Sequence, residues 1–111
     1  NLNALEGIGE LELLVSIGRK VAQVYDVAYG LTVMEEPFVA DNLATVANAA
    51  LRETMGTGTR RLLVKSWVEH LDSVREQTAQ PLTAGDAESL IAGALDELQN
   101  EEVAVVELSG E

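Results

Sequence analysis

Apolar residues between Leu11 and Met34 recur at steps of three and four, the spacing of a helix face. Two such stripes run side by side. They comprise Leu14, Ile17, Val21, Val24, Ala28 and Leu31, and Leu11, Val15, Gly18, Ala22, Tyr25 and Tyr29. An ordinary surface helix has one apolar stripe of about 100°. We therefore predict a helix that needs partners on most of its circumference, either as the central helix of the domain or as part of an oligomer interface.

The start of this helix has an alternative interpretation. Residues 10–13 alternate between acidic and apolar side chains, and residues 13–17 could begin a buried strand instead. We favour the helix because the spacing of three and four continues without a break to Leu31. Gly30 is predicted to end the helix, and residues 1–10 are predicted to form a loose lead-in.

Two helices are expected next. Glu35-Glu36-Pro37 opens the second, because proline and acids suit a first helical turn, and Met55-Gly56 should end it. The third runs from about Arg60 to Gln80, with Pro81 forcing its end. Its apolar stripe contains Leu63, Val64, Trp67, Val68, Leu71 and Val74. Trp67 is therefore expected in the core; if exposed, it would be an interface anchor.

The last helix and the tail differ in character. Thr83 and Asp86 form a capping-box pattern before a clean apolar face that continues to about Asn100. Residues 103–108 are short and rich in valine, which predicts an extended strand. The predicted fold is an all-α, compact four-helix bundle-like domain, 1–111, with a helical core at 11–100 and a short extended acidic C-terminal arm at 101–111.

Composition agrees with one folded domain, since hydrophobic residues make up 47% and charged residues 23% of the 111 residues. The chain has no Cys, which excludes disulfides and thiolate sites. It begins with Asn rather than Met, so we expect a processed form, an excerpt or an incomplete sequence. Charged residues interrupt residues 11–34, and Arg, Lys or Asp each cost roughly 2.5–3.5 kcal/mol inside a membrane. We therefore expect no membrane association.

The net charge is −12, and residues 84–111 supply eight acids and no base. Such a surface repels nucleic acid backbones, so direct nucleic-acid binding is not expected. The adjacent acids Glu35-Glu36, Asp96-Glu97 and Glu101-Glu102 diverge by about 100° on a helix. They are interpreted as a solvated face, or as a face that docks on a basic partner. Arg60, Arg61 and Lys65 are expected to pair with the fourth helix or with a neighbouring copy.

Candidate chemistry is sparse. Glycines at 56 and 58 precede Thr59, a predicted N-cap, and then Arg60 and Arg61, which suggests a weak anion site at a helix N-terminus. The Walker pattern is missing, so an ordinary helix–helix turn is favoured. His70 is the single histidine and is expected to face solvent, because Glu69 and Asp72 do not share its helix face. No catalytic triad, metal site, cofactor site or small-molecule substrate is predicted.

These features favour a non-enzymatic protein-interaction or assembly subunit that self-associates, such as an adaptor, a chaperone or a virion-type structural component. It would be soluble, cytoplasmic or within a larger assembly. The predicted partner-binding residues are Asp96, Glu97, Glu101, Glu102, Val103, Val105, Val106 and Leu108. One alternative is an acidic inhibitor or nucleic-acid mimic that docks on a basic groove, and another is a small-ligand-binding or enzymatic helical domain.

Overall fold

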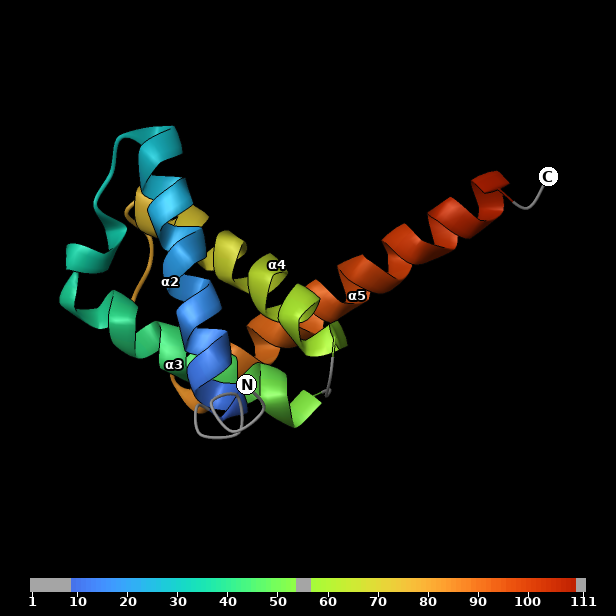
Figure 1. Ribbon diagram of the computed structural model, residues 1–111, viewed down its shortest axis with the longest axis horizontal. Coiled ribbons are helices and arrows are strands. Elements are labelled where there is room, and N and C mark those ends of the chain that lie inside the picture. Colours follow the sequence, from blue (N-terminus) through green and yellow to red (C-terminus); the bar gives the residue numbers. More distant parts are fainter. Residues whose placement is uncertain (1–8, 54–56, 110–111) are drawn as a thin grey trace, which may run out of the picture.

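Four α-helices make up most of the described chain (Figure 1). The computed structural model describes the backbone of residues 9–53 and 57–109 and the side chains of residues 9–53 and 58–100. Its elements are α2 (Glu10–Tyr29), the 3-10 turn η1 (Val33–Glu35), α3 (Pro37–Glu53), α4 (Thr57–Arg75) and α5 (Ala84–Ser109). These ranges contain no strand, so the prediction of an all-α, four-helix domain is confirmed. The predicted lead-in lies largely outside the described residues, and α2 already begins at Glu10.

Helices α3 and α4 form the middle of the domain. Each packs on the other, and α2 and α5 each pack on both, with no comparable contact between α2 and α5 among the described residues. One continuous apolar core joins the four helices. Its largest fully buried side chains are Trp67, Leu14, Leu43, Leu62, Leu63, Leu71 and Ile91.

The prediction that the first helix is central and enclosed within the domain is wrong. Its buried residues are Leu14 from the first stripe and Gly18, Ala22 and Tyr25 from the second. Along the first stripe, Ile17 and Val21 are half-buried, while Val24 and Ala28 are exposed. The physical reason is the packing order, since α2 has helices on one side only. The alternative prediction, an oligomer interface, is left standing.

Close packing joins α2 to α3 and α4 at Gly18. The Trp67 indole Nε1 donates a hydrogen bond of 2.9 Å to the Gly18 carbonyl oxygen. A Cβ added at Gly18 would overlap the Leu43 side chain, lying 3.1 Å from Cδ2 and 3.2 Å from Cγ. Trp67 is fully buried, which confirms the prediction that it belongs to the core.

The helix ends are set by local hydrogen bonds. Gly30 follows α2 in the left-handed conformation with φ 66°, as predicted, and the Asp26 carboxylate accepts a bond of 2.9 Å from Val33 N–H. α3 begins at Pro37, also as predicted. The predicted end of this helix at Met55-Gly56 lies outside the described residues.

The third helix is shorter than predicted. It ends at Arg75 rather than near Gln80, because Gln77 adopts a left-handed φ of 63°. The Gln77 N–H bonds the Val74 carbonyl and the Thr78 N–H bonds the Ser73 carbonyl, which together make a Schellman cap. Pro81 therefore does not end the helix.

A buried polar cluster holds the segment between α4 and α5 in place. The Asn42 amide donates to Gln80 O and contacts His70 Nε2, both at 3.0 Å, and its oxygen accepts from Leu82 N–H at 2.8 Å. His70 is only 4% exposed and stacks on Trp67, so the prediction that it faces solvent is wrong. Burial lowers the pKa of His70, which keeps the ring neutral.

α5 begins with the predicted capping box, in which Thr83 and Asp86 exchange two hydrogen bonds of 3.1 Å. The prediction that residues 103–108 form an extended strand is wrong, because α5 continues as a helix to Ser109. A helix satisfies its own backbone hydrogen bonds, whereas a lone strand leaves them without partners. Figure 1 shows the C-terminal part of α5, in red, projecting away from the other helices.

Candidate interaction surface

The exposed side of α2 carries an apolar face. Val24 is 71% exposed, Val27 is 87% exposed and Tyr29 is 52% exposed, and they are the large hydrophobic side chains most open to solvent in the described chain. Single exposed apolar residues are common on protein surfaces, but a contiguous group is informative. Val24 forms such a group with the half-buried Ile17 and Val21, which lie seven and three residues before it on the same side of α2, and Val27 lies one turn further along the helix.

This face deepens into a groove where α2 meets α4. The groove has a volume of about 430 Å³ and its accessible lining is wholly apolar. Val68 contributes from α4, and the remaining lining comes from α2. The lining residues are Ile17, Lys20, Val21, Val24, Tyr25, Ala28, Tyr29 and Val68. Since Lys20 is exposed, it places a positive charge at the edge of an otherwise uncharged groove.

Polar contacts keep one end of the groove rigid. The Tyr25 hydroxyl donates a bond of 2.7 Å to Asp72 Oδ1 and accepts one of 2.9 Å from Arg75 Nε. The Arg75 guanidinium also lies 4.5 Å above the centre of the Tyr29 ring. Burial and the bond to Asp72 raise the pKa of Tyr25, so it stays protonated at neutral pH. The C-terminal ends of α2 and α4 are thereby joined, and the groove is formed before any partner arrives.

The predicted acidic partner site lies on a different helix. Asp96 and Glu97 are exposed on α5. The backbone of Glu101, Glu102, Val103, Val105, Val106 and Leu108 belongs to the projecting part of the same helix, and their side chains lie outside the described ones. The structure thus places these residues on one continuous helix rather than on a helix and a strand.

Glu97 faces a second carboxylate across the contact between α4 and α5. Burial, and then the neighbouring Glu97, raise the pKa of Glu69, which is half-buried on α4. The Glu69 Oε2 atom is enclosed and has no hydrogen-bond partner. The two carboxylates therefore cost stability when both are ionised, and none of the cavities described here opens beside them.

The weak anion site is not assembled. α4 begins at Thr57, so Thr59 lies inside the first turn rather than at the predicted N-cap position. Thr59 is fully buried and its hydroxyl has no hydrogen-bond partner, whereas Arg60 and Arg61 are exposed. The structure therefore does not bring these three side chains to one place.

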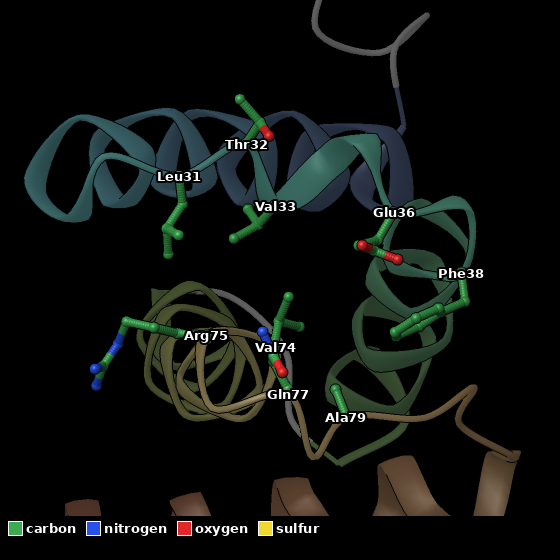
Figure 2. A pocket seen from close by; sticks show the side chains of 9 residues that line it. All are labelled: Leu31, Thr32, Val33, Glu36, Phe38, Val74, Arg75, Gln77 and Ala79. Atoms are coloured by element: carbon green, nitrogen blue, oxygen red, sulfur yellow. The ribbon is translucent and has the colours of Figure 1, made fainter.

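A second cavity, of about 380 Å³, lies where η1, the start of α3 and the end of α4 meet. Figure 2 shows Phe38 and Val74 pointing toward it, with Glu36 at its side, while Arg75 points away. Arg75 is engaged with Tyr25 and Tyr29, so Glu36 is the one ionisable lining residue left to meet a ligand. Ligand sites usually combine an apolar pocket with several convergent polar groups. Thr32 and Gln77 are the other polar residues that line this cavity, and neither carries a charge.

Comparison with known proteins gives no further guide to the site, as no protein-family model, curated protein or solved structure matches the chain. Within the described residues, no three His, Cys, Asp or Glu side chains are placed to share a metal ion. None of the helices described is long and apolar enough to cross a membrane.

Proposed function

We propose that the protein is a non-enzymatic interaction or assembly subunit that self-associates through the groove on α2. The observation that carries this proposal is the accessible stripe of the half-buried Ile17 and Val21 and the exposed Val24 and Ala28. Its steps of four, three and four residues match those of helix-pairing seams. The core uses only part of this stripe. Ile17 and Val21 pack against the core while remaining partly accessible, whereas Val24 and Ala28 are exposed.

Covering this face is energetically favourable. Full burial of a valine side chain contributes about 1.5 kcal/mol or more. Since Val24 is 71% exposed, burying it in the groove contributes about 1 kcal/mol or more before the costs of association. The preformed groove lowers those costs, because few side chains must be ordered on binding.

One substitution and a matched control test this proposal. Val24→Glu places a charge in the groove, whereas Gln23→Glu places the same charge one residue away on the exposed polar side of α2. In sedimentation velocity over a range of concentrations, we expect the parent and Gln23→Glu to associate. Val24→Glu should remain near the monomer mass of 11.9 kDa. A monomeric parent at every concentration would remove the proposal.

The acidic surface of α5 supports a second candidate, an inhibitor or nucleic-acid mimic that docks on a basic groove. Asp96 and Glu97 are exposed, and no basic residue follows them in the sequence. Salt separates the two candidates, because ions screen contacts between exposed charges but leave an apolar interface largely intact. Replacing Asp96 and Glu97 by Asn and Gln should abolish binding of a basic partner under the second candidate and leave self-association unchanged under the first.

A further inference from the structure

The groove on α2 is open in the structure, and the backbone at the C-terminal end of α5 projects away from the other helices. Helix α5 packs on α3 and α4 through Ala87, Ile91 and Ala94, with Leu98 half-buried at the margin. Beyond this point it continues to Ser109 and projects alone (Figure 1). The projecting part continues a helix that is already formed, so it needs no new nucleus. Burial of its apolar residues against a surface would add stability.

The sequence of α5 continues its apolar stripe into the projecting part. Steps of three and four lead from Ile91 through Ala94 and Leu98 to position 101, and then to Val105 and Leu108. Glu101 is the single interruption of this heptad-like seam. The exposed stripe on α2 has the same spacing. Two helices with such stripes pack side by side when their apolar seams meet.

Charge favours pairing these two surfaces with one another. Residues 99–109 contain Glu101, Glu102 and Glu107 and no base, while Lys20 lies at the edge of the groove. Pairing α2 with α2 would bring Lys20 of both copies to one seam, and pairing α5 with α5 would bring their glutamates together. Like charges facing one another oppose such contacts.

The two surfaces belong to different copies of the chain. α2 and α5 each pack on α3 and α4 without comparable contact between themselves, and the end of α5 projects away from the domain. We propose that the C-terminal part of α5 from one copy lies in the α2 groove of a second copy. If the exchange is reciprocal, it closes a dimer with two equal contacts. This inference rests on the proposed function and names the occupant of the groove.

Point variants in the full chain test the exchange. Val105→Glu places a charge on the α5 seam, and Val103→Glu places the same charge on the opposite side of that helix as its control. We expect Val105→Glu, like Val24→Glu, to weaken dimerisation by at least about tenfold, the equivalent of 1.4 kcal/mol. Val103→Glu should leave the dimer unchanged. Circular dichroism should show that every variant is as helical as the parent.

Mixing the Val24→Glu and Val105→Glu chains and measuring their association tests the exchange most directly. A chain with Val24→Glu keeps an intact α5 end, and a chain with Val105→Glu keeps an intact groove. The exchange therefore predicts that the mixture associates more strongly than either variant alone. Single-cysteine versions check this geometry, since the chain has no native Cys. Val24→Cys mixed with Val105→Cys should give mainly mixed disulfides under mild oxidation.

Two outcomes separate this inference from the proposed function. In the first outcome, the parent dimerises, Val24→Glu prevents dimerisation and Val105→Glu does not. The exchange is then wrong, and the interface on α2 stands. A mixture that associates no better than its components, or cysteine variants that give only homodimers, also overturns the exchange. If the parent is monomeric, both proposals fail.

Discussion

Replacing Asn42 by Ala should destabilise the domain strongly, because this one side chain joins three parts of the fold. It bonds Gln80 O at 3.0 Å, Leu82 N–H at 2.8 Å and His70 Nε2 at 3.0 Å, and it is 1% exposed. A net contribution of about 0.5–1.5 kcal/mol for each hydrogen bond gives a loss of roughly 2–4 kcal/mol. That is a large part of a typical stability of about 5–15 kcal/mol.

The matched control is Asn48→Ala in the same helix. Asn48 is exposed, and its amide bonds only the Ala44 carbonyl of its own helix, at 3.1 Å. Alanine favours the helix, so this change should be neutral or slightly stabilising. Urea unfolding followed by circular dichroism and by Trp67 fluorescence measures both variants. If Asn42→Ala unfolds within about 0.5 kcal/mol of Asn48→Ala, the cluster does not hold the connecting segment.

The same cluster predicts a pH dependence. The Asn42 oxygen is used by Leu82 N–H, so the amide nitrogen points to His70 and the ring must accept at Nε2 in its neutral form. Burial lowers the folded-state pKa of His70 below its ordinary 6.5, so the unfolded chain binds the proton first. The contribution of neutral His70 to the free energy of unfolding is therefore fully present above pH 6.5. It is lost as the pH falls through that value toward the lowered pKa. His70→Gln should flatten the loss of unfolding free energy between about pH 7 and 5; an unchanged slope would contradict this account.

Further predictions follow from single contacts. Gly18→Ala forces the buried Leu43 to move and should lower the free energy of unfolding by about 1–3 kcal/mol. Its control is Gly93→Ala at an exposed position of α5, where the new Cβ meets no atom within 4 Å and should raise the free energy of unfolding by about 0.5–1 kcal/mol. Equal melting temperatures would refute the close approach at Gly18. Glu69→Gln should raise the melting temperature at pH 7 and reduce its dependence on pH, since burial and Glu97 both penalise the ionised form; a lower melting temperature would show that this carboxylate is satisfied. Val24→Asp should leave the fold of the single chain intact, because Val24 is 71% exposed; unfolding of the monomer would restore the prediction of an enclosed helix.

Helical periodicity and capping residues were enough to predict most of the fold. The start of α3 at Pro37, the end of α2 at Gly30 and the capping box of Thr83 and Asp86 depend on neighbours within a few residues. The early end of α4 was not predictable in this way. It depends on Gln77 adopting a left-handed conformation that glycine usually occupies.

How much of each α2 stripe the core buries could not be predicted, because both stripes are apolar and tertiary packing decides between them. The burial of His70 had a signal, since it lies three residues after Trp67 and four before Val74, on the buried face of α4. Asn42 likewise follows Val39 by three residues and precedes Val46 by four. Their spacing indicated burial, but both side chains are polar and were therefore expected to face solvent. Their pairing depends on tertiary structure, which the sequence pattern does not contain.

The valine-rich end of α5 was misassigned from local preference. β-branched residues favour strands on average, but this tendency depends on a partner strand. The described residues contain no strand to pair with. Continuation of a helix already started at Ala84 needs no new nucleus, and this favours the helical form.

The molar mass of the full chain in solution tests the central claim most directly. Light scattering should show a concentration-dependent rise from 11.9 kDa toward about twice that value, and the rise should persist at high salt because the interface is apolar. A mass that stays at 11.9 kDa at every concentration and salt would contradict self-association through the α2 groove.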